Sequence, residues 1–186
     1  MAKLIYLTNV SLDGYIEDRD GVFDLFEHDA DVFGFTTELV RSVGSIVYGR
    51  RLYELMAVWE TDPDLAAQSD LFAAFSAAWR ATSKVVFSTT LTDVSTADTR
   101  LERRFDPALV RELKDAVSRD LLIGGADIAS QALEARLVDE YQLFVWPSLI
   151  GGGKPALSHD ARHDLELLDE RRFDNGVVHL RYRVLT

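Results

Sequence analysis

The chain has 186 residues, of which 47% are hydrophobic, a formal net charge of −11 and no cysteine. Such a length buries one sizeable core, so we expect one domain over residues 1–186. Without cysteine, disulfides, thiolate nucleophiles and Cys-ligated metal centres are excluded, and the negative charge argues against nucleic acid as a partner.

The sequence also argues against a membrane segment or secretion. The longest uncharged stretch of interest, residues 141–153, is well short of the ~20 apolar residues that a spanning helix needs. The N-terminus shows no signal-peptide pattern. We therefore expect a soluble protein in a reducing compartment, the cytoplasm.

Strand-like and helix-like runs alternate along most of the chain, which indicates an α/β domain with a central sheet covered on both faces. In chain order, we expect strands at residues 3–10, 45–48, 84–88 and 120–123. Helices are expected over residues 32–43, 69–81 and 128–137, and another is expected to start at Asp106 and Pro107, an N-cap and a first-turn proline.

The C-terminal third has a different character, because three expected strands follow one another without a helix, at residues 138–149, 164–173 and 176–185. The last two are joined through Asn175 and Gly176, residues that favour the positive φ angles of a tight hairpin. We expect a mostly parallel sheet that ends in antiparallel strands.

Three strand-to-helix junctions carry residues suited to binding an anion. Gly49, Arg50 and Arg51 follow one strand, the hydroxyls of Ser88, Thr89 and Thr90 end another, and Gly124 and Gly125 follow a third. Taken singly, each junction has an ordinary interpretation as a turn or a solvated helix start. Together they lie at the edge where α/β sheets bind ligands.

Two common nucleotide motifs are excluded. The run Gly151-Gly152-Gly153-Lys154 has Ser148 where a Walker A loop begins with glycine, and Pro155 where that loop has a hydroxyl. No G-x-G-x-x-G follows the first strand, so the Rossmann fingerprint is missing as well.

Five segments in order resemble the successive motifs of the dihydrofolate-reductase-like superfamily, and specifically its RibD C-terminal reductase branch. They are SLDGYI from Ser11, GRRLYE from Gly49, KVVFSTTL from Lys84, IGGA from Ile123 and PSLIGGGK from Pro147. The resemblance implies a three-layer α/β/α fold of the dihydrofolate reductase type, an NAD(P)H-dependent oxidoreductase and a small heteroaromatic substrate such as a pyrimidine or pteridine. It also implies a homodimer, for which Phe144, Val145 and Trp146 offer apolar surface, although these residues could equally be core.

The same resemblance assigns the cofactor residues. It implies that the first two junctions hold the adenosine phosphate of NADPH, and that Gly124 and Gly125 are joined by a cis peptide and cradle the pyrophosphate with the helix start that follows them. Asn9, Ser11 and Ile16 are expected to face the nicotinamide and the substrate ring. The full expected set is Asn9, Ser11, Ile16, Gly49, Arg50, Arg51, Leu52, Ser88, Thr89, Thr90, Gly124, Gly125, Ala126, Asp127 and Ile128.

Two positions depart from the family pattern. Leu52 replaces the usual threonine and loses its hydroxyl, and the carboxylate of Asp127 lies where folate reductases place a basic residue near the 2′-phosphate, which leaves NADH possible as the cofactor. A non-catalytic ligand-binding module with the same fold is therefore the alternative.

Candidates for acid and metal chemistry are few. Asp31 is the carboxylate nearest to the position where folate reductases bind the pterin, although a helix-capping role beside Asp29 is the competing interpretation. His159 and His163 have the i, i+4 spacing of metal ligands, but no third ligand is evident and we expect no metal.

Overall fold

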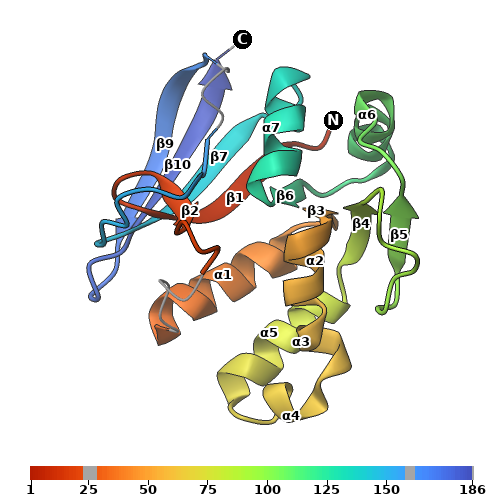
Figure 1. Cartoon of the computed structure of the whole chain (residues 1–186), viewed down its shortest axis with the longest axis horizontal. Coiled ribbons are helices and arrows are strands. Elements are labelled where there is room, and N and C mark those ends of the chain that lie inside the picture. The colour runs from red at the N-terminus through yellow and green to blue at the C-terminus, as the bar shows by residue number, and fades with distance from the viewer. Residues whose placement is uncertain (23–28, 158–161, 186) are drawn as a thin grey trace.

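An eight-stranded sheet forms the centre of the computed structural model, which describes residues 1–22, 29–157 and 162–185 (Figure 1). The strand order is β5-β4-β3-β6-β1-β7-β10-β9. Neighbouring strands from β5 to β7 are parallel, whereas β10 is antiparallel to both β7 and β9, as the sequence predicts. The strands are β1 (Leu4–Ser11), β3 (Ser45–Gly49), β4 (Ser83–Phe87), β5 (Thr99–Glu102), β6 (Leu121–Gly124), β7 (Glu140–Trp146), β9 (Asp164–Arg172) and β10 (Val178–Leu185).

Most of the longer helices begin at side chains that accept hydrogen bonds from their first N–H groups. Asp29 caps α1, Ser69 caps α5 and Asp106 caps α6, with Pro107 at the first position. The helices are α1 (Ala30–Ser42), α2 (Arg50–Met56), α3 (Val58–Thr61), α4 (Pro63–Ala66), α5 (Asp70–Arg80), α6 (Pro107–Ala116) and α7 (Ala126–Glu134). In the described part of the chain, no helix has both the length and the apolar character needed to cross a membrane.

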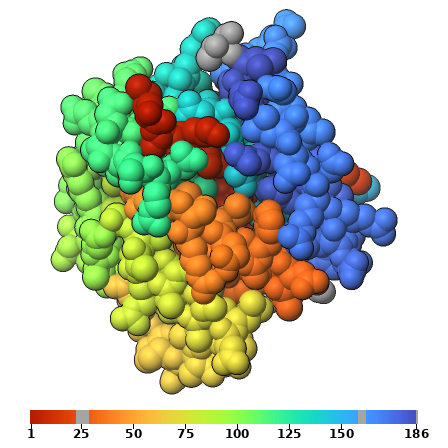
Figure 2. All heavy atoms as spheres, turned by 180° about the vertical axis from the view of Figure 1, so that it is seen from behind, coloured from red at the N-terminus to blue at the C-terminus, as the bar shows by residue number. Residues whose placement is uncertain are grey.

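The sheet separates two cores because successive strand residues point to opposite faces. Val47 and Ile123 pack with α6 and α7 on one face, while Ile46 and Leu122 pack with α1, α2 and α5 on the other. Seen from behind, α1 occupies the middle of its face, between α5 and the strands β9 and β10 (Figure 2). Phe144 and Trp146 belong to a third buried cluster with Phe173, so they form core in this chain.

A short ribbon of two antiparallel strands, β2 (Tyr15–Glu17) and β8 (Lys154–Pro155), lies apart from the main sheet. The glycine run beside it serves packing: a Cβ on Gly153, whose φ is +145°, would lie 2.0 Å from the carbonyl oxygen of Glu17. The carboxylate of Asp13 accepts hydrogen bonds from the backbone N–H groups of Ile150 and Gly151. The hydrogen bond from the hydroxyl of Ser11, followed by these backbone contacts, holds the pKa of Asp13 below its ordinary value.

Several boundaries differ from the sequence prediction. Helix α7 begins at Ala126, two residues earlier than expected, because Gly125 with φ +97° supplies the turn. The expected strand at residues 138–149 is shorter, from Glu140 to Trp146, since the chain then turns toward the ribbon. Strands β2, β5 and β8 were not predicted, because they are only two to four residues long, too short to show a strand pattern.

Candidate functional site

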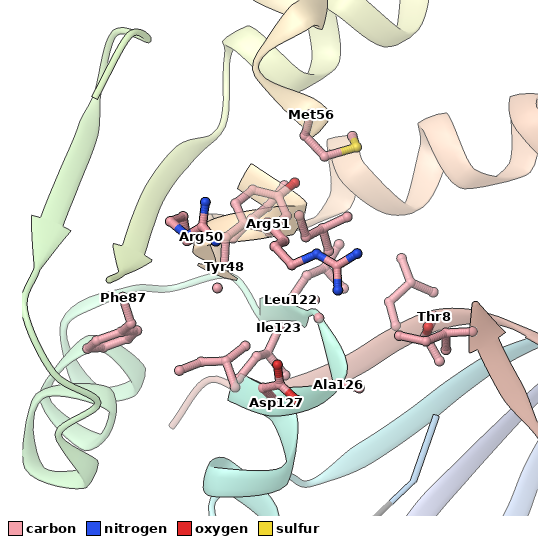
Figure 3. A pocket seen from close by; sticks show the side chains of 18 of the residues that line it. Thr8, Tyr48, Arg50, Arg51, Met56, Phe87, Leu122, Ile123, Ala126 and Asp127 are labelled. Carbon is pink, nitrogen blue, oxygen red and sulfur yellow. The ribbon is translucent and has the colours of Figure 1, made fainter. Parts of the chain in front are cut away.

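A cavity of about 770 Å³ opens at the carboxyl ends of β1, β3, β4 and β6. This is the edge at which open α/β sheets bind ligands. Figure 3 shows Arg50 and Arg51 on one side of the cavity and Ala126 and Asp127 on the other, with Phe87 near one end and Thr8 near the other. The three junctions predicted from the sequence therefore meet in one place, but the one that follows β4 leads to β5 and not to a helix.

All but one of the expected cofactor residues line this cavity. The lining includes Asn9, Ile16, residues 49–52, 88–90 and 124–128. Ser11 does not line it: its side chain is buried, donates a hydrogen bond to Asp13 and accepts one from the N–H of Tyr15. Ser11 instead shapes the turn that carries the ribbon.

Two helix starts face the cavity without a side-chain cap. Gly49 precedes α2 and Gly125 precedes α7, and neither helix has a side-chain hydrogen bond at its N-cap. Asp29, Ser69 and Asp106 supply that bond to α1, α5 and α6. The first N–H groups of α7 are consequently available to an anionic ligand, and the helix dipole favours negative charge there.

Ion pairs join the ribbon to both helix starts. Arg51 forms two hydrogen bonds to the carboxylate of Glu17, at 3.0 and 3.1 Å, and Lys154 Nζ lies 2.5 Å from Asp127 Oδ2. Arg50 pairs with Glu54 one turn further along α2. Asp127 is thus accompanied by a cation, which reduces the repulsion that its carboxylate alone would exert on a phosphate.

The glycine turn differs from the expectation in its peptide bond. The Gly124–Gly125 peptide is trans, so the expected cis bond is wrong. The positive φ of Gly125 makes the turn, and a trans bond avoids the ~3 kcal/mol that a non-proline cis bond costs. The space beside Gly124 is occupied by Leu52, whose Cδ2 would lie 2.7 Å from a Cβ at that position.

One end of the cavity is polar and includes residues that sequence reasoning missed. Arg103 and Arg104 follow β5 and line the cavity. Because β5 was not predicted, nothing in the sequence placed this arginine pair at the same sheet edge as Arg50. Arg103 donates hydrogen bonds to the carbonyls of Leu91 and Thr92, which fixes the loop after β4. We call the following set the polar end: Arg50, Ser88, Thr89, Thr90, Arg103 and Arg104.

The opposite part of the cavity is apolar and lies between the sheet and helices α1, α2 and α5. Its polar side-chain atoms among the described residues are two hydroxyls, those of Thr36 and Tyr48. We call this part the chamber, which is formed by Leu7, Thr36, Val40, Ile46, Tyr48, Met56, Phe75, Leu122 and Phe144.

The candidate acid and metal ligands lie elsewhere. Asp31 is exposed in the first turn of α1 and does not line the cavity, and Asp29 accepts the capping hydrogen bonds from the N–H groups of Asp31 and Val32. His159 is outside the described residues. Within the described ranges, no group of three or more His, Asp or Glu side chains is arranged to hold a metal ion.

The fold is of the dihydrofolate reductase type. Over 100% of both chains it superposes on a candidate riboflavin biosynthesis protein from Shewanella sp. PV-4, with a TM-score of 0.75 and 22% identity. A dihydrofolate reductase from Enterococcus faecalis, solved in complex with NADP(H), gives a TM-score of 0.66 at 12% identity, covering 99% of this chain and 97% of that one.

Sequence comparison places the chain more narrowly. The pattern of the RibD C-terminal domain matches residues 2–179, and the chain belongs to this family. It is also similar to YyaP, an uncharacterized protein of Bacillus subtilis (strain 168), with 31% identity over 190 residues, which cover 97% of this chain and 94% of YyaP.

Proposed function

We propose that the chain is an NAD(P)H-dependent reductase acting on a small heteroaromatic substrate, with the dinucleotide lying across the cavity. The observation that carries this proposal is the continuity of one cavity from the polar end, past the start of α7, to the apolar chamber. A dinucleotide requires that sequence of environments: cations and hydroxyls for the adenosine phosphate, backbone N–H groups for the pyrophosphate and an apolar pocket for the rings.

The residues of the polar end fit a phosphate monoester. Arg50 and Arg104 are exposed guanidinium groups, and Ser88, Thr89 and Thr90 add hydroxyls at the end of β4. The oxygen of Ser88 already accepts hydrogen bonds from the N–H groups of Thr90 and Leu91, which orders this loop. Two arginines beside hydroxyls favour the 2′-phosphate of NADPH over NADH.

At the other end, this chain's residues would position the rings and exclude water. A bound nicotinamide supplies the hydride in such a reaction. Asn9 Oδ1 accepts a hydrogen bond from Trp146 Nε1 at 3.0 Å, which fixes the Asn9 amide at the rim, and Ile16 is buried in the wall. We assign Asp31 no part in this arrangement, since it does not line the cavity.

Binding and turnover test the proposal separately. NADPH is expected to raise the melting temperature of the protein and to quench its tryptophan fluorescence, more strongly than NADH at equal concentration. Oxidation of NADPH, followed at 340 nm across a panel of pyrimidines and pteridines, reports turnover. A melting curve that neither nucleotide moves at millimolar concentration would refute the proposal.

A non-catalytic binding module is the second candidate, and a specific observation favours it. Leu52 fills the space beside Gly124 with an apolar side chain and supplies no hydroxyl to the site. This candidate predicts that NADPH binds without oxidation in the presence of every heterocycle tested. Sustained turnover with any member of the panel would eliminate it.

We also propose that two copies pair through β9. This nine-residue strand lies at the edge of the sheet, and Leu165 and Leu167 on it are 41% and 48% exposed. Long edge strands with apolar side chains tend to pair with another chain. Light scattering should give the mass of two chains, and Leu167→Lys should reduce it to the mass of one chain. A single-chain mass for the unaltered protein would contradict the pairing.

A further inference from the structure

The hydroxyl of Tyr48 lies in the wall of the chamber, and its proton is available for a hydrogen bond. Tyr48 is 4% exposed, and its oxygen accepts a hydrogen bond from Trp79 Nε1 at 2.9 Å. A phenol also carries one proton to donate, and buried tyrosines normally give that proton to a partner. Among the described residues, no acceptor for this proton is found. The structure therefore fixes the position of the Tyr48 oxygen and leaves its proton available to a bound ligand.

The other hydroxyl of the chamber, that of Thr36, already donates its proton within the protein. Thr36 Oγ1 donates to the carbonyl oxygen of Val32 at 2.9 Å, so its proton is used within α1. Of the two hydroxyls of the chamber, that of Tyr48 is thus the one with a proton to offer a ligand. Figure 3 shows its side chain extending from β3 with the hydroxyl toward the side where Met56 lies.

The rest of the chamber favours a flat, uncharged molecule. Val40, Phe75 and Phe144 present apolar surface from α1, α5 and β7. The charged lining residues belong to the helix starts, the polar end and the ribbon, where Arg51 is paired with Glu17 and Lys154 with Asp127. A carboxylate pushed into the chamber would lose its hydration without gaining a cation, which is strongly unfavourable.

Building on the proposed reductase function, we propose that the chamber binds an uncharged, flat aromatic ring and that Tyr48 donates a hydrogen bond to a ring nitrogen or carbonyl oxygen of that ring. Such a bond positions the ring against the nicotinamide side of the cavity. Burial raises the pKa of Tyr48 above its ordinary value, so the phenol keeps its proton across the physiological range. Tyr48 therefore acts as a donor and not as a base.

Two rings of the same shape test this assignment in the free protein. Quinoline carries a ring nitrogen that accepts a hydrogen bond, and naphthalene does not. Dissociation constants are measured by NMR titration for the unaltered protein, for Tyr48→Phe and for Tyr53→Phe. Tyr53 is the matched control, because it is also a buried phenol but bonds to Thr96 and does not line the cavity.

The informative quantity is the change in the ratio of the two dissociation constants from one protein to another, since the difference in hydrophobicity between the rings is the same in each protein and cancels. Tyr48→Phe should weaken quinoline relative to naphthalene by about fivefold, the value of one net hydrogen bond, and Tyr53→Phe should leave the ratio unchanged. The ¹⁵N resonance of bound quinoline should also move to the range of a hydrogen-bonded ring, a measurement that needs no variant. An unchanged ratio in Tyr48→Phe, or a bound quinoline nitrogen without a hydrogen bond, overturns the role of Tyr48.

A third probe tests the charge of the ligand. The anion 1-naphthoate should displace quinoline at least tenfold less effectively than naphthalene does, because the chamber would have to desolvate its carboxylate. Equal displacement, or failure of both neutral rings to bind, overturns the proposed ligand class. These outcomes are separable from the reductase proposal: NADPH binding with no effect of Tyr48→Phe rejects only the Tyr48 assignment, whereas quinoline discrimination without NADPH binding rejects only the reductase.

Discussion

At the polar end of the cavity the chain offers guanidinium groups and hydroxyls at the ends of strands, whereas the chamber is formed by single side chains from several distant elements. The start of α7 and the ribbon depend on backbone turns with positive φ, at Gly125 and at Gly151 to Gly153, that few residues other than glycine adopt. The chamber depends on how α1, α2, α5 and β7 pack against the sheet. The comparison teaches that the walls of one cavity can be held in place in two ways, by backbone turns and by side-chain packing. Substitutions in the two regions should therefore destabilise the protein for different physical reasons.

The largest expected effect is at the ribbon, whose Glu17 and Lys154 pair with residues at the starts of α2 and α7. In Gly153→Ala, the new Cβ would overlap the backbone of Glu17 and Asp18, and φ is +145°, so the ribbon cannot keep its conformation. We expect a loss of about 3 kcal/mol in the free energy of unfolding. Gly151→Ala is the matched control, because its φ is also positive, at +74°, but nothing lies within 4 Å of its Cβ; it should cost about 1 kcal/mol. Urea denaturation measures both, and equal losses would contradict the role given to the overlap.

The chamber side should instead respond to acid, through a histidine packed behind Phe144. His179 is 1% exposed, its ring centroid is 4.8 Å from that of Phe144, and its Nε2 lies 3.1 Å from Gln142 Oε1. Burial lowers the pKa of His179 to about 4, with Arg181 and Arg171 acting in the same direction and Asp169 opposing them. The folded state therefore prefers the neutral ring.

The sign of the pH dependence follows. The unfolded chain binds a proton near pH 6.5, so the stability due to neutral His179 is complete above that value and is lost as the pH falls toward 4. We expect this group to account for about 2 kcal/mol of the loss in unfolding free energy between pH 7 and pH 4. His179→Gln should flatten the plot of unfolding free energy against pH between pH 7 and pH 4. His163→Gln is the control, because His163 is a half-buried loop residue, and it should leave the plot unchanged. A curve for His179→Gln parallel to that of the unaltered protein would exclude this source.

The two parts of the cavity also differ in how far the sequence could predict them. Each of the three junctions is contiguous in sequence, and parallel strands bring their carboxyl ends to one edge of the sheet. Gly49, Ser88 and Gly124 could therefore be placed together before the fold was known. Tyr48 and Phe75 look like ordinary core residues in the sequence, because only tertiary packing shows that a space remains between them. Arg103 and Arg104 were missed because the four residues of β5 are too few and too polar to show a strand pattern.

A charge substitution at the polar end should change binding with little effect on stability. Arg50→Ala removes an exposed i, i+4 ion pair with Glu54, which contributes at most about 0.5 kcal/mol to the fold. Under the proposed function, it should weaken NADPH about tenfold, and NADH less, because one guanidinium contact to the 2′-phosphate is lost. Arg111→Ala, on α6 and outside the cavity lining, is the control. Equal weakening of the two nucleotides would show that Arg50 does not distinguish them.

The smallest expected effect is at Gly124, in the turn between β6 and α7. In Gly124→Ala, the Cβ would lie 2.7 Å from Leu52 Cδ2, and the end of that flexible side chain must move. We expect a cost of about 1 kcal/mol, less than for Gly153→Ala, because a leucine rotamer adjusts more easily than a backbone.

A double substitution identifies the cause of that cost. If Leu52 is the obstacle, Gly124→Ala should cost almost nothing when it is made in a Leu52→Ala background, so the two free energies of unfolding should be non-additive by about 1 kcal/mol. Additive losses would mean that the glycine is required for the backbone itself. Leu52 contacts the turn that is expected to meet the pyrophosphate. If its side chain restricts access to that turn, the single Leu52→Thr change should strengthen NADPH binding. An unchanged dissociation constant would show that the side chain does not restrict access.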